Sequence, residues 1–97
     1  MIEGKTKSGF KFKIDGRILD DWSLVEAIAL SDSDDASEKI SGLKKLYDII
    51  VGDQGDALKK HIADKNDGYV PTEQLSAMLV EIITTARELK NLQSSEG

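Results

Sequence analysis

The sequence predicts an α+β fold that is mostly helical, with an N-terminal β-hairpin followed by three shorter helices and one long C-terminal helix. Three observations support this prediction. Residues 10–14 alternate between apolar side chains and lysines, which is the period of a strand with one buried face. Residues 71–91 repeat apolar side chains at i, i+3, i+4 and i+7, which is the period of an amphipathic helix. Between this strand and this long helix lie shorter helical segments, and the polar stretch at residues 31–37 separates the first two of them.

The hairpin is predicted over residues 1–17. Its second strand has the stronger support, and the turn before that strand falls at Ser8-Gly9, because glycine accepts a positive φ. The partner strand, within residues 2–7, has weaker support because few of its side chains are apolar or β-branched. Two strands alone are marginally stable in water, so helices must cover the apolar face of the hairpin.

The helical part of the chain is predicted over residues 18–92, with a frayed tail at residues 93–97, and residues 1–97 form a single domain. The three shorter helices are expected at residues 21–30, 36–51 and 53–64. The long helix is expected to open with Pro71 at its first helical position, where a missing N–H costs nothing. At about 1.5 Å per residue it would be about 30 Å long, so the shorter elements should pack against it.

Several polar residues are placed to cap these helices. Asp20 or Asp21 can cap the first shorter helix, although Ser23 offers a competing capping box with the glutamate three residues later. Asp35 can cap the second shorter helix. In its interior, Gly42 is tolerated at a cost of about 1 kcal/mol relative to alanine.

The composition excludes several classes of function. The chain has 97 residues, of which 39% are hydrophobic and 32% charged, and its net charge of −5 argues against nucleic acid and acidic membrane surfaces as partners. It has no cysteine, so disulfides, thiolate nucleophiles and cysteine-based zinc sites are impossible. We expect no membrane span and no signal peptide, and therefore a cytoplasmic location.

No catalytic motif is present, so we do not expect an enzyme, a cofactor or a bound metal. His61 is the only histidine and has no second ligand at HxxxH or HExxH spacing, so it is expected to be a partly exposed surface residue. The serines do not form a GxSxG or SxxK motif, and the glycines form no phosphate-binding loop. The acidic pairs at residues 20–21 and 34–35 are interpreted as helix caps and loop solvation.

Two alternative functions remain open. The first is a calcium-responsive helical module, because residues 64–70 are similar to part of an EF-hand loop, which needs a glycine at position 6 and a glutamate at position 12. If Asp64 is position 1, Gly68 falls at position 5, one position before the glycine that the loop requires. Counting from Gly68 places Lys65 at position 3 and Gln74 at position 12, so either register loses ligands. The interpretation without calcium is an Asx/Gly turn between two helices.

The second alternative is a nucleic-acid-binding accessory protein that uses a lysine-rich hairpin. The hairpin is basic, whereas residues 20–38 are strongly acidic, and the basic residues are Lys5, Lys7, Lys11, Lys13 and Arg17. We expect these lysines to face solvent, where they can also block unwanted strand pairing, and the phenylalanines to face the core. A basic end and an acidic middle could also support head-to-tail self-association.

Two helices are predicted to carry apolar side chains over more than one face. Such a broad stripe can form a second buried contact within the domain or bind a partner, and the sequence leaves both interpretations open. The candidate partner-binding residues are Trp22, Leu24 and Ile28 in the first helix and Val80 and Ile83 in the long helix.

The opening GKTKSGFKFKIDGRILDDWSLVEAIA resembles the small tail assembly chaperones of long-tailed, siphovirus-type bacteriophages of Gram-positive hosts. It joins an "SGF–F–I–D" strand directly to a "DDW–L–E" helix. The acidic loop, the segment GLKKLYDIIVGDQGDALKKHI, the turn DKNDGYVP and the long helix are similar too, so the resemblance covers residues 4–90.

The resemblance implies a non-enzymatic role in phage or prophage tail assembly. Such chaperones keep the tape measure protein soluble, recruit tail tube proteins and tend to self-associate as homo-oligomers in the host bacterial cytoplasm. They are not part of the mature virion, and no functional residue can be carried over because the family has no catalytic motif. Many such phages use a programmed frameshift near the end of the gene to make a longer product. Leu89-Lys90-Asn91 can be encoded as TTA AAA AAC, which contains a slippery heptamer for frameshifting.

Overall fold

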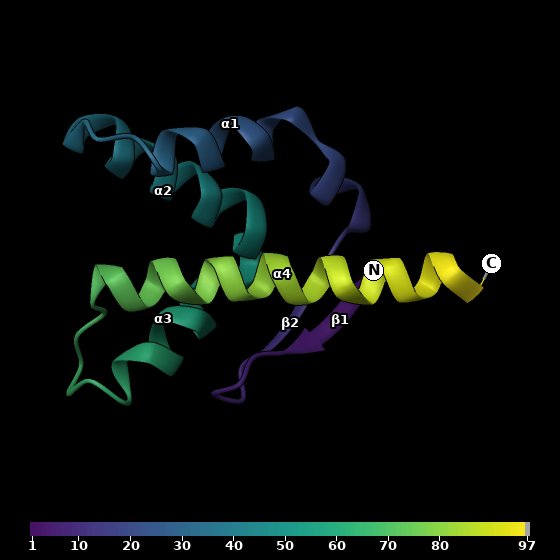
Figure 1. Ribbon diagram of the computed structural model, residues 1–97. Helices are drawn as coiled ribbons and strands as arrows, with labels where there is room; N and C mark the ends of the chain where they lie inside the picture. Colours follow the sequence, from purple (N-terminus) through teal and green to yellow (C-terminus); the bar gives the residue numbers. More distant parts are fainter. Residues whose placement is uncertain (97) are drawn as a thin grey trace.

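The structure, a computed structural model, describes residues 1–96 and the side chains through residue 92. It confirms the predicted fold: an N-terminal hairpin, three shorter helices and a long C-terminal helix, with two short 3-10 helices between them (Figure 1). The elements are β1 (Ile2–Lys5), β2 (Lys11–Ile14), η1 (Gly16–Asp20), α1 (Trp22–Ser31), α2 (Ala36–Val51), η2 (Gly52–Gln54), α3 (Gly55–Ala63) and α4 (Thr72–Glu96).

Most helix boundaries agree with the prediction, and the differences have local causes. The bounds of α2 are those predicted, and Asp35 caps it by accepting a hydrogen bond from the backbone N–H of Glu38 at 3.0 Å. The 3-10 turns η1 and η2 were not predicted, and η2 delays the start of α3 by two residues. Pro71 lies one residue before α4, and its carbonyl accepts the N–H of Leu75 at 3.0 Å.

The end of the chain differs from the expectation of a frayed tail at residues 93–97. The long helix α4 continues to Glu96, four residues beyond the predicted end of the helical part at residue 92. Gly97 lies outside the described residues.

The hairpin is antiparallel, and the residues Ile2, Glu3, Gly4 and Lys5 lie opposite Ile14, Lys13, Phe12 and Lys11. Its buried face bears Ile2, Phe12 and Ile14, and its turn contains Gly9 at a φ of 95°. Gly4 allows this face to pack closely: a Cβ there would lie 2.6 Å from the Phe12 ring and 3.1 Å from the Leu89 side chain of α4.

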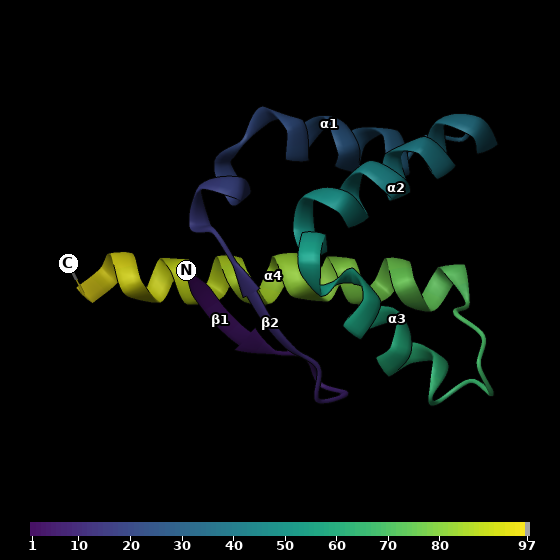
Figure 2. The same cartoon turned by 180° about the vertical axis from the view of Figure 1, so that it is seen from behind.

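The long helix α4 lies in the middle of the molecule. In Figures 1 and 2, α1 and α2 lie on one side of α4, and the hairpin and α3 lie on the other. Its residues Leu79, Ile82, Ile83 and Ala86 are buried and join side chains from the hairpin, α1, α2 and α3 in one apolar core. The expectation that the shorter elements pack against the long helix therefore holds for the hairpin, α2 and α3, which contact it directly.

The helices α1 and α2 pack closely at Gly42. A Cβ on Gly42 would lie 2.4 Å from the backbone nitrogen of Ser31 and 2.6 Å from the backbone carbonyl carbon of Leu30. Real Cβ atoms do not approach backbone atoms this closely, so the contact between the end of α1 and the middle of α2 requires glycine. Sequence patterns alone explain this glycine only as a tolerated loss of helix propensity.

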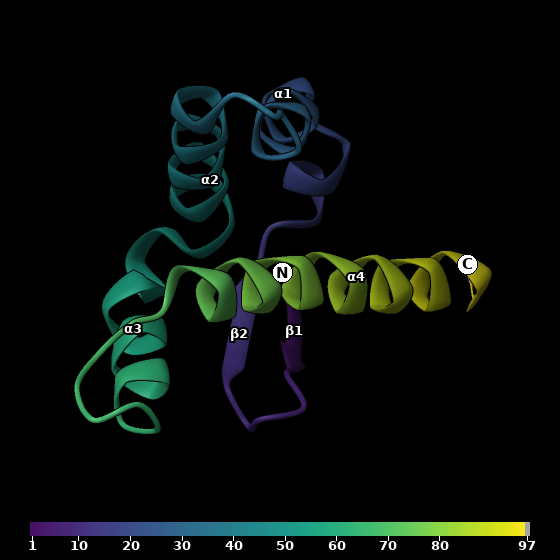
Figure 3. The same cartoon turned by 60° about the vertical axis from the view of Figure 1, so that its left-hand side comes forward.

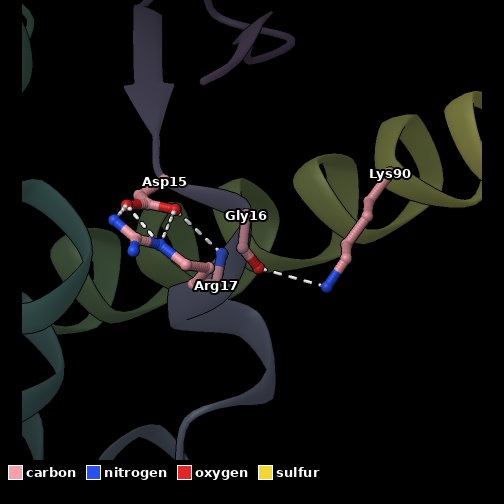
Figure 4. Close-up of polar contacts among 4 residues, drawn as sticks. All are labelled: Asp15, Gly16, Arg17 and Lys90. Carbon is pink, nitrogen blue, oxygen red and sulfur yellow. Dashed lines mark hydrogen bonds and ion pairs between the residues drawn. The ribbon is translucent and has the colours of Figure 1, made fainter.

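The link between β2 and α1 is held by polar contacts (Figure 4). The Asp15 carboxylate accepts hydrogen bonds from the Arg17 guanidinium, the shortest at 2.6 Å, and from the Arg17 backbone N–H at 3.0 Å. The side-chain hydrogen bonds, followed by the backbone one, lower the pKa of Asp15 from 3.8 to about 2. Lys90 of α4 donates to the Gly16 carbonyl at 3.2 Å and pairs with Asp20, which ties α4 to this link.

We predict that Gly42→Ala lowers the free energy of unfolding by about 1–3 kcal/mol, because the added methyl group overpacks the contact with α1. Helix propensity alone would change stability by about 1 kcal/mol in the opposite direction. Urea unfolding followed by circular dichroism measures the difference. Ser41→Ala, at an exposed neighbouring position, is the control and should change stability by no more than about 0.5 kcal/mol. A Gly42→Ala protein as stable as the wild type would contradict the close packing.

We also predict that the Asp15 carboxyl titrates at about 2 in the folded protein. Because this pKa lies below the unfolded value of 3.8, Asp15 stabilises the fold above that pH, and its contribution is lost as the pH falls from 3.8 to about 2. NMR titration of the carboxyl carbon measures the pKa directly. Arg17→Gln should raise it toward 3.8, whereas the exposed Arg87→Gln should leave it unchanged. Equal midpoints in the wild type and Arg17→Gln would rule out the Arg17 contact as the cause.

Candidate partner-binding surface

One face of α1 is apolar and open to solvent. Trp22 is 68% exposed and Val25 is 44% exposed, and Ala29, one turn further on, is exposed as well. Their spacing of three and four residues places all three on the same side of the helix, which we call the α1 outer face. The helix begins at Trp22 because Asp21 accepts a hydrogen bond from the backbone N–H of Ser23 at 3.2 Å, so the aspartate provides the cap in place of the predicted alternative at Ser23.

The structure corrects the placement of Leu24 and refines that of Ile28. Leu24 is 0% exposed and, with Ala27, belongs to the core, so it cannot contact a partner in the folded protein. Ile28 is half-buried and packs against the core. These side chains point away from the α1 outer face because α1 packs on α2 with its opposite side. Of the three candidates in this helix, Trp22 alone is well exposed.

In α4, the structure separates the two candidate residues. Val80 is 55% exposed and lies outside the buried face, as its position on the helix predicts. Ile83 is only 6% exposed and belongs to the core, so the expectation that it binds a partner is wrong. The broad apolar stripe of α4 is explained by a second contact within the protein, because α2 and the hairpin contact this helix from different sides (Figure 1).

A groove lies between the first half of α2 and the first turns of α4. Its volume is about 380 Å³, and it is lined by Lys39, Ile40, Leu43, Thr72, Glu73, Ser76 and Ala77. The groove exists because α2 inclines away from α4 toward its own N-terminus (Figures 1 and 2). Ile40 shares the apolar spacing of α2 but is 69% exposed, so sequence periodicity alone places it wrongly on the buried face.

His61 is partly exposed, as expected, and has a structural role. Its Nε2 atom lies 3.0 Å from the Ser8 hydroxyl, and its ring centroid lies 5.6 Å from that of Phe10. The same hydroxyl donates to the sulfur of Met78 at 3.7 Å. These contacts attach the hairpin turn to α3 and α4.

The turn between α3 and α4, considered above for calcium, is held by amide side chains. Asn66 donates to Gln74 at 2.8 Å, and Gln74 donates back to Asn66 at 3.1 Å. Asn66 also donates to the carbonyl of Ile62 at 2.8 Å, while Asp67 and Gly68 have φ values of 54° and 90°. Among the side chains described, those of residues 1–92, no three acidic or histidine groups converge where a metal ion could bind. The calcium-responsive module remains a prediction from the sequence, and no contact in the structure favours it.

The lysines of the hairpin lie where the sequence predicts. Lys5, Lys11 and Lys13 are exposed, whereas Phe10 and Phe12 are buried in the core. The phenylalanine rings are therefore not available for stacking on nucleic acid bases. Lys13 forms an ion pair with Glu3 on the same face at 3.6 Å.

Comparison with protein-family models, with curated proteins and with solved structures found no match to this chain. Among the residues that the structure describes, no helix combines the length and the apolar character needed to cross a membrane.

We predict that Leu24 and Trp22 differ sharply in their contribution to stability. Leu24→Ala should lower the free energy of unfolding by about 2–5 kcal/mol, because it leaves a cavity in the core. Trp22→Ala should change it by only about 0.5 kcal/mol, because the ring lies at the surface. Urea unfolding of both variants tests the assignment of one residue to the core and the other to the α1 outer face. Similar losses from both variants would contradict it.

Proposed function

We propose that this protein is a non-enzymatic interaction protein and, more specifically, a tail assembly chaperone of long-tailed phages or prophages of Gram-positive bacteria. In this role it acts in the host bacterial cytoplasm as a homo-oligomer, binds tape measure and tail tube proteins while the tail is built, and is absent from the mature virion. The sequence resemblance supports the specific role. The exposed apolar face of α1 is the observation that supports binding to another protein.

The α1 outer face has the properties of a partner-binding surface. A tryptophan that is largely exposed in the free protein offers a large apolar area, and tryptophan is enriched among the residues that dominate binding energy. Full burial of an apolar side chain such as Val25 is worth about 1.5–3 kcal/mol. The face is formed by a regular, capped helix, so little additional order is needed when a partner binds.

The groove between α2 and α4 provides a second apolar surface. Ile40 and Ala77 face it from the two helices, and Lys39 and Glu73 also line it. A groove between two helices that has apolar walls and charged side chains among its lining residues suits the apolar side chains of a partner helix. Val80, one turn beyond Ala77, adds to the apolar surface of α4.

The test is a pull-down of the tape measure and tail tube proteins encoded beside the native gene, using this protein as bait. The wild type should retain at least one of them, and Val25→Lys should weaken retention about tenfold or more, because a charge replaces an apolar contact. Ser23→Lys is the matched control, since it adds the same charge to an exposed position of α1 outside the outer face. It should bind as the wild type does.

Two results would contradict the proposal. If the wild type retains neither tail protein when they are co-expressed, the chaperone role is wrong. If Val25→Lys, Ile40→Lys and Val80→Lys all bind as tightly as the wild type, the α1 outer face, the α2–α4 groove and the exposed flank of α4 are not the binding site. Circular dichroism of each variant shows that it remains folded.

A further inference from the structure

The two edges of the hairpin sheet differ. On the β2 edge, the side-chain amide of Gln54 pairs with the backbone of Lys13: the Lys13 N–H donates to Oε1 at 2.7 Å, and Nε2 donates to the Lys13 carbonyl at 2.7 Å. Gln54 thus occupies the position of a neighbouring strand at this point. The backbone N–H and carbonyl of Lys13 therefore point away from β1. The backbone N–H and carbonyl of Glu3, which lies opposite Lys13, point away from β2.

The β1 edge is open at two residues. Outward- and inward-pointing residues alternate along a strand, so Lys5 points its N–H and carbonyl outward as Glu3 does. The inward bond from the Thr6 N–H to the Phe10 carbonyl at 2.9 Å agrees with this alternation. Within the described part of the chain, the outward groups of Glu3 and Lys5 have no hydrogen-bond partner. The open stretch ends at Lys7, whose N–H donates to Glu81 of α4 at 2.6 Å.

At Lys5, the open edge borders a groove of about 520 Å³. One wall is the chain at Lys5 and Lys7, and the other is the flank of α4 that carries Val80, Thr84 and Glu88. Figure 3 shows β1 as the strand farther from α3, with α4 continuing past it on the open side. The groove is therefore bounded by an unpaired strand and by a helix flank that carries short side chains at Val80 and Thr84 and carboxylates at Glu81 and Glu88.

We propose that this groove binds an extended segment of a partner protein, which adds to β1 as a third, antiparallel strand. Only an extended backbone presents N–H and carbonyl groups at the spacing of those of Glu3 and Lys5. On the outer face of the sheet, a lysine of the segment opposite Glu3 and a glutamate opposite Lys5 form cross-strand pairs of opposite charge. The alternate side chains of the segment face α4, where Val80 and Thr84 favour small apolar or β-branched residues. This inference does not depend on the proposed chaperone role.

A second copy of this chain does not fit the groove through its own β1. Two identical antiparallel strands are related by a two-fold axis perpendicular to the sheet, which places both α4 helices on the same face. The flank of α4 from Val80 to Glu88 already lies beside the open edge, so the α4 of a second copy would collide with it. The partner segment must therefore come without such a helix beside it.

The experiment uses a synthetic peptide with valine at every second position, so that the valines face α4. The positions between the valines face the other side and carry a glutamate followed by a lysine. When this probe lies antiparallel to β1, its glutamate is opposite Lys5 and its lysine is opposite Glu3. A peptide of the same composition with the two charged residues exchanged is the control. Fluorescence anisotropy should show the probe binding to the wild-type protein about tenfold more tightly than the control. Amide hydrogen exchange should slow at Glu3 and Lys5 when the probe binds.

Two proline variants distinguish the two edges. Lys5→Pro removes the outward N–H of β1 without touching the ladder, and Lys11→Pro makes the same change on β2 directly opposite. Lys5→Pro should weaken probe binding about tenfold or more, whereas Lys11→Pro should leave it unchanged. Lys5→Gln keeps the N–H and should weaken binding by only about threefold.

The proposal is overturned if the wild type does not bind the probe at millimolar concentration, or if the two proline variants, shown to be folded by circular dichroism, bind it equally. It is also overturned if the amides of Glu3 and Lys5 are protected from hydrogen exchange without the peptide and this protection increases with protein concentration. A second copy of the chain would then occupy the edge.

Discussion

Burial of α4 on two sides is the interaction on which the arrangement of the other elements depends. The residues Leu79, Ile82, Ile83 and Ala86 are in the core, and each large apolar side chain buried in this way is worth about 1.5–3 kcal/mol. A two-stranded sheet is marginal by itself, and so is a pair of short helices. The hairpin and α3 use one side of α4 and α2 uses another, so each side provides apolar surface that the smaller elements lack (Figure 1).

The same arrangement leaves α1 at the outside of the molecule. Gly42 lets the end of α1 approach the backbone of α2. In the same helix Leu24 lies in the core, whereas Trp22 is exposed. A helix that packs mainly on one neighbour keeps the opposite face free. The α1 outer face is thus a consequence of packing and at the same time the best candidate for contact with another protein.

The hairpin shows a related division between structure and interaction. Unpaired strand edges promote unwanted association, and proteins usually protect them. Gln54 closes the β2 edge at Lys13 and Glu81 closes the β1 edge at Lys7, so the outward groups at Glu3 and Lys5 of β1 and at Lys11 of β2 remain open. The β1 edge has the longer open stretch and is bordered by a groove. A partner strand is therefore expected to add to β1 and not to β2.

The sequence by itself determined the order of the elements, the bounds of α2 and the alternating burial of the hairpin, because periodicity and helix caps such as Asp35 depend on neighbouring residues. Only the tertiary structure decided which apolar residues remain exposed. Leu24 and Trp22 are both apolar residues of α1, and the position of α2 determines that Leu24 is buried and Trp22 is exposed. Ile40 shares the spacing of buried residues but lies where α2 and α4 diverge. The pairing of Gln54 with Lys13 joins residues 41 positions apart, so no local pattern could predict it.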